Sequence, residues 1–446
     1  MATRRAFIRS LPALGTAILV SCKKKKPGIT SARKSGKRDA VVYRAVNGHP
    51  ADNLEKVLSL MGRVEALFGQ DDIVILKPNL QWFNQGAPNI AAMDRFVTLI
   101  MEMKGGFRGE VVVAENVHRG PQPWERVGWS VPFARNSDMP GIVNYGGLAA
   151  HLKRKYGDRF SVCHLVDIAS GGKRVHSPAD GPGYVLCDGT GGIPLQSFEN
   201  GLTGTNRREV VMSYPILRTD KGTLVDYRWG VWEKGTYTDR PVKFVNCAAL
   251  NHHSSFCGMT SAVKNYLGVS DLGGGSDPSR NGQLVKGYHN FHSFAFNWNK
   301  KGPVRGMLGA EVGYFLRTVR RPFLNITTAE YCGLADRTEL PVARTRAVAA
   351  STDPVALDFH MAKYVLFANS RISVHDPEDL DSPTEQYLAQ CARSGGYCYD
   401  EARVEVKSFD LSSGTFQRDE ELVIRGEKEW GGNSRSLLKY AVFRVL

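Results

Sequence analysis

The chain has 446 residues, of which 42% are hydrophobic, 10% aromatic and 23% charged. This balance excludes a collagen-like, coiled-coil or wholly disordered protein, and the length allows two or three domains or one enlarged α/β domain. The formal net charge of +14 would suggest a nucleic-acid binder, but residues 1–38 hold eleven Lys and Arg and no acidic residue. The rest of the chain has 47 basic and 44 acidic residues. We therefore expect no nucleic-acid partner.

The first residues have the pattern of an export signal. Arg4 and Arg5 lie in a context that resembles a twin-arginine signal, and an apolar run follows over 11–20. This run is too short to cross a bilayer, which takes ~20 residues, but it has the length of a signal h-region. It ends in Leu-Val-Ser-Cys, which resembles a bacterial lipobox, so Cys22 is the predicted lipidation site. A buried N-terminal helix is the alternative interpretation.

Residues 23–38 are rich in Lys, Ser and Gly and contain no apolar run. Such a composition is typical of a flexible tether between a lipid and a folded body. Four consecutive lysines would lie beside anionic headgroups and strengthen an anchor that a single acyl chain makes only marginally stable. We therefore predict a lipoprotein of the bacterial cell envelope, membrane-associated on the extracytoplasmic (periplasmic) side.

Seven further cysteines follow the leader, and none belongs to a CxxC pair. An odd number cannot pair completely within the chain. Cys391 and Cys398 could close a small loop, but export of an already folded chain favours scattered structural thiols.

The folded body begins with alternating strands and helices. The pattern predicts strands over 40–46, 72–77 and 110–114, and helices over 53–62 and 93–103. The last two strands are continuous apolar runs, as in buried parallel strands. Repeated strand–helix–strand units predict an α/β fold with a mostly parallel sheet of βαβ units.

Residues 120–240 are rich in Gly and Pro, and we expect an insertion of short strands and loops over the sheet. The α/β pattern returns with a strand at 242–247, a helix at 259–267, a strand at 346–350 and a helix at 353–367 that begins at Asp353-Pro354. The predicted division is a twin-arginine-type signal (1–21), a lipidated basic tether (22–38), a first α/β half (39–119), the insertion (120–240), a second α/β half (241–370) and a C-terminal extension with short β-like runs (371–446).

The densest polar stretch, residues 251–268, follows a buried strand directly. The amides of a helix that begins there, at Gly258, would favour an anion in the crevice at the strand ends. Lys264 lies in the second turn of that helix, and Lys77 ends another predicted strand. Two ammonium groups that meet at one edge would favour an anionic ligand; a solvated helix lysine is the alternative for Lys264.

His252, His253 and Cys257 are residue types that bind zinc, iron or copper, although their spacing matches no closed site. A transition metal is therefore one interpretation of this group. Histidines that are hydrogen-bonded within a loop are the other.

Three segments, 74–79, 244–268 and 350–358, resemble the bacterial and archaeal domain of unknown function 362 family. The matches to its middle signature are Val245-Asn246, Gly258-Met259-Thr260, Ala262-Val263-Lys264-Asn265 and Gly268, and His253 takes the family's His position if one residue is inserted before Gly258. The resemblance covers about residues 40–370 and implies the fold and a crevice, but no reaction.

The chain departs from the family pattern at several points. Asn251 stands where the family has a lysine before its His, and Thr328 replaces an acidic residue. The ferredoxin-like CxxCxxC segment of some relatives is absent from the sequence. No acid-dependent or cluster-dependent reaction is therefore carried over.

The sequence leaves three functions open. The first is an exported enzyme, redox or metal-assisted, that acts on a small anionic or carbonyl substrate. Its candidate catalytic residues are Lys77, His253, Lys264 and Asn265, and its candidate cofactor-binding residues are Asn79, Gly258 and Thr260. The second is a surface-tethered lipoprotein that binds a ligand in the same crevice without catalysis. The third, a structural envelope protein, explains the anchor but not the crevice. Neither the cofactor nor the oligomeric state follows from the sequence.

Overall fold

The computed structural model describes residues 39–116, 127–169, 174–187, 209–210, 212–253, 257–271, 288–289, 306–431 and 434–445. The predicted signal, Cys22 and the tether lie outside these residues, so their export and lipidation stay predictions. In the part of the chain that is described, no helix is both long enough and apolar enough to cross a bilayer.

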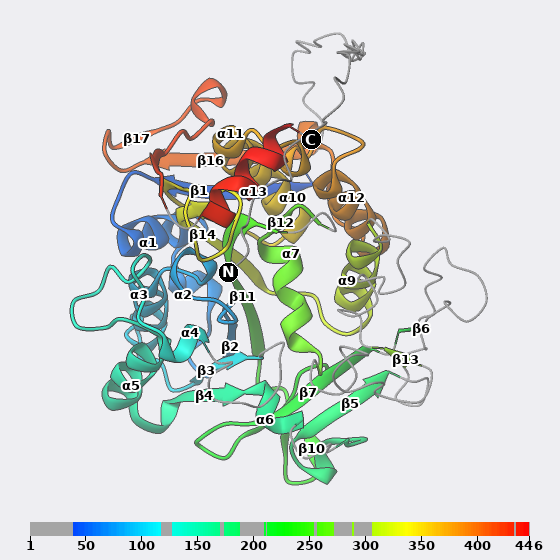
Figure 1. The fold of residues 1–446 in the computed structure, drawn as a ribbon. Helices are drawn as coiled ribbons and strands as arrows, with labels where there is room; N and C mark the ends of the chain where they lie inside the picture. Colours follow the sequence, from blue (N-terminus) through cyan, green and yellow to red (C-terminus); the bar gives the residue numbers. More distant parts are fainter. Residues whose placement is uncertain are drawn as a thin grey trace, which may run out of the picture. The chain divides into compact units, whose positions relative to one another are not determined.

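The body is an α/β fold on a mixed, mostly parallel sheet (Figure 1). The strand order is β17-β16-β1-β15-β14-β11-β2-β3-β4. These strands are β1 (Ala40–Val46), β2 (Ile73–Lys77), β3 (Glu110–Glu115), β4 (Phe160–His164), β11 (Val242–His252), β14 (Leu324–Gly333), β15 (Val342–Ser351), β16 (Val404–Asp410) and β17 (Thr415–Phe416), with β12 (Met259–Thr260) on β11 and β18 (Glu427–Glu429) on β15. The predicted strands at 40–46, 72–77 and 110–114 are therefore confirmed.

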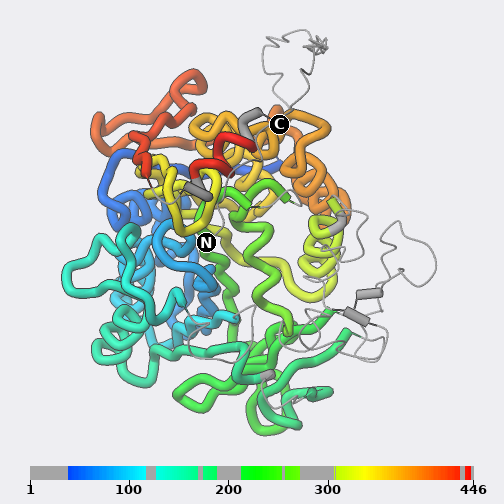
Figure 2. The backbone as a smooth tube through the Cα atoms, viewed as in Figure 1, coloured from blue at the N-terminus to red at the C-terminus, as the bar shows by residue number. Residues whose placement is uncertain are grey.

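The strand order reverses direction between β2 and β11. From β2 the chain continues outward to β3 and β4, whereas from β11 it continues to β14 and β15 on the other side. β2 and β11, far apart in the sequence, run side by side and parallel (Figure 2). In open α/β sheets, ligands bind at the carboxyl ends of the strands where such a reversal occurs. This edge of the sheet is therefore the candidate site.

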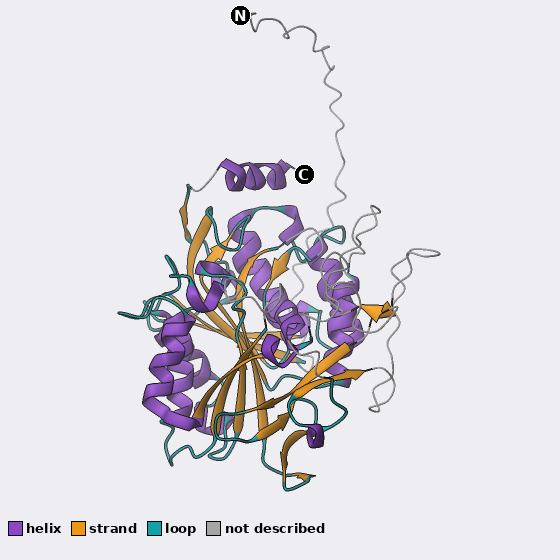
Figure 3. Ribbon diagram, turned by 60° about the horizontal axis from the view of Figure 1, so that its bottom comes forward, coloured by secondary structure: helices purple, strands orange, loops and turns teal. Residues whose placement is uncertain are grey.

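Helices cover both faces of the sheet, as Figure 3 shows. Successive side chains of a strand point to opposite faces. Val74 and Leu76 pack into one core, and Ile73 and Ile75 into the other. The first core contains α1 (Pro50–Leu60), α3 (Ile90–Met101) and α5 (Tyr145–Tyr156); the second contains α7 (Ala262–Asn265), α9 (Met307–Thr318) and α12 (Pro383–Gly395).

The Gly/Pro-rich insertion starts later than predicted. α5 and β4 fall within 120–240, yet β4 pairs in parallel with β3 and extends the main sheet. The sequence hid this helix because its first turn is Tyr145-Gly-Gly, and Asn144 caps it by accepting the N–H of Gly147 at 2.9 Å. Five later strands of this region form a separate antiparallel sheet: β5 (Gly183–Cys187), β7 (Met212–Arg218), β8 (Leu224–Asp226), β9 (Gly230–Glu233) and β10 (Thr236–Tyr237).

Three predictions for the second half are corrected. Met259 and Thr260 form β12 against β11, so the predicted helix at 259–267 starts only at Ala262. β15, predicted as one more α/β strand, runs antiparallel to both β1 and β14. The extension at 371–446 contains α12 and α13 (Ser434–Val445) in addition to its short strands.

Two helix starts show how local capping works in this chain. α10 (Pro354–Met361) begins as predicted, because Asp353 accepts the N–H groups of Val355 and Ala356 at 2.9 Å each. The helix predicted at 53–62 begins earlier, at Pro50, with His49 at its N-cap. Asn53, the first residue of the predicted helix, is buried within α1.

α9 and α12 pack with almost no space between their backbones. A Cβ atom added at Gly309 of α9 would lie 1.9 Å from the carbonyl oxygen of Tyr387 in α12. At Gly313 it would lie 2.4 Å from the carbonyl oxygen of Cys391. Glycine is thus required at both positions for the helices to approach this closely.

The cysteines of the body are free thiols, as predicted. All seven lie among the described residues, and none is bonded to another. Cys391 is buried and Cys398 is partly exposed, and no bridge links them.

Candidate functional site at the carboxyl edge of β2 and β11

A row of polar side chains crosses the sheet where β2 ends. Lys77, Asn246 and Asn325 occupy in-register positions on β2, β11 and β14. All three are almost completely buried. They lie on the face that α7 covers, because Ile75 and Phe244, two residues earlier on their strands, belong to the same core as the residues of α7.

α7 binds this row through Asn265. The Lys77 ammonium donates to Glu115 Oε1 at 2.9 Å, to Asn265 Oδ1 at 2.9 Å and to the carbonyl of Pro78 at 3.0 Å. The Asn265 amide donates to Asn246 Oδ1 at 2.8 Å. All three ammonium protons of Lys77 and both parts of the Asn265 amide therefore have partners within the fold.

Glu115 changes the interpretation of Lys77. A Lys77 beside a second ammonium group, as the sequence predicts, would need a ligand anion to balance the two charges. The structure provides an internal anion: Glu115 forms a buried ion pair with Lys77. Burial lowers the pKa of Lys77 and raises that of Glu115. Lys77 and Asn265 thus hold β2, β3, β11 and α7 together.

The N-terminus of α7 also has an internal anion. The N–H groups of Ala262 and Val263 donate to the two carboxylate oxygens of Asp358 at 2.8 Å each. Burial raises the pKa of Asp358 to about 7, against the effect of these hydrogen bonds. These amides, which the sequence pattern assigns to a ligand anion, therefore already bind a carboxylate of the protein.

Lys264 differs from Lys77. No hydrogen bond or ion pair joins it to any residue in the described part of the chain, and its side chain is only partly exposed. Burial lowers its pKa to about 8, and the positive charges of Arg337 and Lys77 act in the same direction. Arg337 comes from the loop between β14 and β15, and its guanidinium lies 4.4 Å from the ring centre of Trp82. Positive charge thus converges at this edge.

His253 and Cys257 lie next to each other, with Cys257 Sγ 3.4 Å from His253 Nδ1. Burial raises the pKa of Cys257 to about 11, although Lys264 and Arg337 oppose the shift. The group is therefore a thiol at neutral pH. An imidazole beside a thiol and a lysine is a set that can transfer protons to and from a bound molecule.

The predicted metal ligands His252, His253 and Cys257 do not form one site. His252 Nδ1 lies 2.8 Å from His375 Nε2, whose other ring nitrogen lies 2.7 Å from the Ser370 hydroxyl. Burial lowers the pKa of His252 to about 3, so it is neutral. Consecutive residues at a strand end point to opposite sides, which separates His252 from His253. Among the described residues, no three His, Cys, Asp or Glu side chains are arranged to hold a metal ion.

The three candidate cofactor-binding residues have different environments. Asn79 follows β2 and is partly exposed. Gly258 has φ of +68°, and a Cβ there would lie 2.0 Å from Thr384 Oγ1, so its glycine is explained by backbone geometry. Thr260 is 4% exposed, and its hydroxyl has no hydrogen-bond partner among the described residues. Thr260 is therefore the one of the three whose side chain carries a buried hydroxyl without a partner among the described residues.

Sequence reasoning missed Glu115, Arg337 and Asp358. Glu115 could have been found, because it directly follows a predicted strand that is parallel to the strand that Lys77 ends. Asp358 lies in a segment that the family resemblance includes, but its partners are 95 and 96 residues away. Arg337 lies in a loop whose sequence carries no signal.

Comparisons of the chain with protein-family models, with curated proteins and with solved structures find no match. The family resemblance therefore stays a prediction.

Proposed function

We propose that the protein is an exported, lipid-anchored enzyme that acts on a small anionic or carbonyl compound at the carboxyl edge of β2 and β11. One observation carries the proposal: the Lys264 ammonium lies there without a partner among the described residues, and Arg337 adds positive charge. A partly buried charge without a counterion costs free energy. A carboxylate or phosphate group of a ligand would remove that cost.

The neighbouring groups supply the remaining chemistry. The Thr260 hydroxyl could donate to a second oxygen of the ligand, because it has no partner among the described residues. His253 is the general acid or base in this proposal, since imidazole is the side chain best suited to proton transfer near neutral pH. The Cys257 Sγ atom lies 3.4 Å from His253 Nδ1, within hydrogen-bond reach of the ring.

A second function, ligand binding without catalysis, is favoured by a specific observation. Two of the four candidate catalytic residues, Lys77 and Asn265, are fully bonded within the fold. The thiol of Cys257, with its pKa raised to about 11, is also a poor nucleophile at neutral pH. A surface-tethered binding protein would need only Lys264 and Arg337.

Lys264→Met tests the anion site. Inorganic phosphate and small carboxylates are added to the purified protein, and the rise in Tm is measured. We expect at least one anion to stabilise the wild type and to lose this effect in Lys264→Met. The effect should also fall as pH rises through about 8, where Lys264 loses its charge. Without ligand, Lys264→Met should be as stable as the wild type or more stable, by up to ~3 kcal/mol, because the lowered pKa means that the charged form opposes folding below pH 8.

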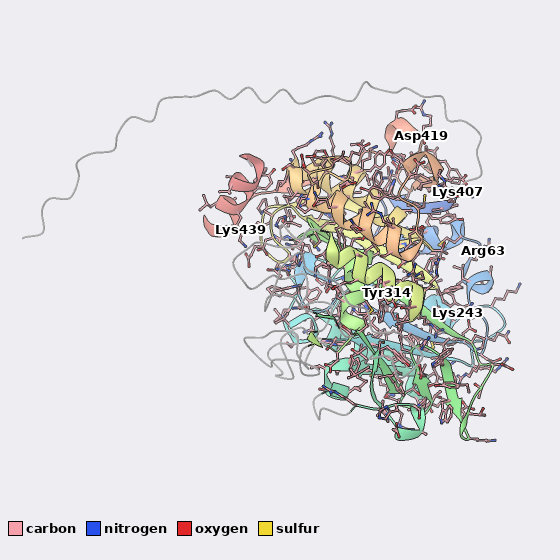
Figure 4. The ribbon with its side chains drawn as sticks, turned by 90° about the vertical axis from the view of Figure 1, so that its right-hand side faces the viewer. Arg63, Lys243, Tyr314, Lys407, Asp419 and Lys439 are labelled. Atoms are coloured by element: carbon pink, nitrogen blue, oxygen red, sulfur yellow. The ribbon has the colours of Figure 1, made fainter. Side chains whose placement is uncertain are left out.

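Lys243→Met is the matched control. Lys243 is also a partly exposed lysine, but it lies at the opposite end of β11, with its ammonium 4.0 Å from the ring centre of Phe323 (Figure 4). This variant should keep the response to the anion. Equal responses in wild type and Lys264→Met would contradict the proposed site.

His253→Gln separates the two functions. The bound anion is incubated with protein and followed by NMR. An enzyme should convert it, and the variant should bind it without conversion. Binding by the wild type without conversion would favour the second function.

The export prediction has its own test. Replacing Arg4 and Arg5 with Lys should leave precursor in the cytoplasm. Unchanged export of the doubly substituted chain would exclude the twin-arginine route.

A further inference from the structure

The side-chain nitrogen of Lys264 has no role in holding the fold together. Lys77 has three acceptors within the fold, whereas Lys264 forms no hydrogen bond and no ion pair with any residue that the structure describes. The Lys264 side chain is partly exposed, so a small molecule can reach it. The nitrogen is therefore available to a ligand, as a cation or as a neutral amine.

The helix that carries Lys264 is held in place on both sides of this residue. α7 packs against β11, α9 and α10 (Figure 1). Before Lys264, the N–H groups that open the helix bind the carboxylate of Asp358. After it, the side-chain amide of Asn265 donates to the backbone carbonyls of Lys77 and Cys247 at 3.0 Å each. The side chain of Lys264 thus extends from a fixed point beside the strand ends.

The surroundings of Lys264 favour its neutral form. Burial and the positive charges of Arg337 and Lys77 lower its pKa to about 8, against an opposing effect of Cys257. At pH 7 this raises the fraction of neutral amine on the order of 100-fold above that of an ordinary lysine. A lysine that is withdrawn from water beside other cationic groups is an activated nucleophile, because its nitrogen lone pair is not occupied by a proton.

We propose that Lys264 forms a Schiff base with a small 2-oxo acid. This inference rests on the proposed enzymatic function and names its substrate class. A 2-oxo acid has a carboxylate directly next to its carbonyl carbon. The positive charge of Arg337 attracts the carboxylate while the Lys264 amine reaches the carbonyl carbon. A simple aldehyde lacks the anionic group that this charge favours, and an anion without a carbonyl has no carbon for the amine to attack.

The chemical step needs neither an oxidant nor a reductant. The lone pair of the neutral Lys264 nitrogen forms a bond to the carbonyl carbon, and the π electron pair of the C=O bond moves to the oxygen, which takes a proton from the nitrogen. The resulting carbinolamine loses its hydroxyl group as water, with a proton supplied by His253. A C=N bond replaces the C–O bond, so the products are a protonated imine and one water molecule.

Reduction of the imine traps this adduct on the wild-type chain. The purified protein is incubated with pyruvate, or with 2-oxoglutarate, and sodium cyanoborohydride, and its tryptic peptides are analysed by mass spectrometry. We expect a saturable adduct on Lys264 with the mass of the 2-oxo acid less one oxygen atom. Lys264 should be modified about tenfold or more faster than Lys243, a partly exposed lysine at the other end of β11. Lactate, which has a carboxylate but no ketone, should leave no adduct.

Lys264→Arg separates the Schiff base from the anion site. Arginine keeps the positive charge at every working pH, but its guanidinium is not deprotonated and forms no imine. The variant should therefore keep the rise in Tm with lactate and lose the adduct, whereas Lys264→Met should lose both. The peptide map of the wild type depends on no variant, so the test holds even if a substituted chain fails to fold.

Two outcomes would overturn the proposal. The first is the absence of an adduct on Lys264 with both 2-oxo acids; if lactate still stabilises the wild type and not Lys264→Met, the anion site stands and only the Schiff base is excluded. The second is an adduct as abundant on Lys243 as on Lys264, which would indicate ordinary surface reactivity. An adduct on Lys264 without stabilisation by any anion would support the Schiff base and contradict the anion site.

Discussion

Lys77→Met is expected to destabilise the protein strongly, because it leaves a buried carboxylate without its counterion. Lys77 is 1% exposed and Glu115 is 4% exposed. The substitution also removes the donor to Asn265 Oδ1. Breaking one side of a buried ion pair costs ~3–5 kcal/mol. Since whole domains are stable by ~5–15 kcal/mol, this is a large part of the total.

A double-mutant cycle isolates the pair. Glu115→Gln alone should also destabilise, because the Lys77 ammonium stays buried without an anion. Combining the two substitutions leaves no buried charge, so the double variant should lose less stability than the two single losses together. A coupling of ~2 kcal/mol or more is expected, near the upper range for groups in contact. Urea denaturation of the four proteins gives this value.

An exposed ion pair serves as the control. Arg108 and Asp71 are both more than half exposed and are joined by two hydrogen bonds, at 2.6 and 2.9 Å. Arg108→Met should leave the midpoint of urea denaturation nearly unchanged, because solvent screens this pair. If Lys77→Met were as stable as the wild type or more stable, Lys77 would be the repelled ligand-site lysine of the sequence interpretation, and the structural role would be refuted.

The remaining predictions concern α7, the α9–α12 contact and the leader. Asp358→Asn should cost ~1–3 kcal/mol, because an amide offers only one acceptor to the two N–H groups that bind Asp358. Burial raises the pKa of Asp358 from 3.8 to about 7, so the free energy of unfolding of the wild type should fall as pH rises through that interval. The stability of Asp358→Asn, measured by urea denaturation, should lack this part of the pH dependence. Gly309→Ala should lower Tm, because the added methyl group forces α9 away from Tyr387 at a cost of ~1–3 kcal/mol or more. Gly147→Ala in α5 should be tolerated, because the nearest atom to the added Cβ would lie 3.4 Å away. Equal Tm values for the two variants would be inconsistent with the close contact between α9 and α12. A fatty-acid probe should label the wild type and not Cys22→Ser, and equal labelling of both would exclude lipidation at Cys22.

Local patterns were sufficient for the first half of the fold. The apolar runs that form β2 and β3 are buried on both faces, so their hydrophobicity alone marks them as strands. The cap at Asp353 was also predictable, because its partners are only two and three residues away. Local patterns failed at α5, where two glycines obscure the first turn, and at Met259, where pairing with β11 overrides the helical pattern.

The sequence by itself therefore determined the α/β class and predicted that polar side chains lie at the carboxyl edge of the sheet, because the ends of parallel strands follow from the strands themselves. Only the tertiary structure decided which charges are neutralised. Glu115 reaches Lys77 across 38 positions, and Asp358 reaches the start of α7 across about a hundred. Such pairings depend on strand order and helix packing, which no local pattern encodes. They separate Lys77, a buried residue of the fold, from Lys264, whose charge has no partner in the described part of the chain.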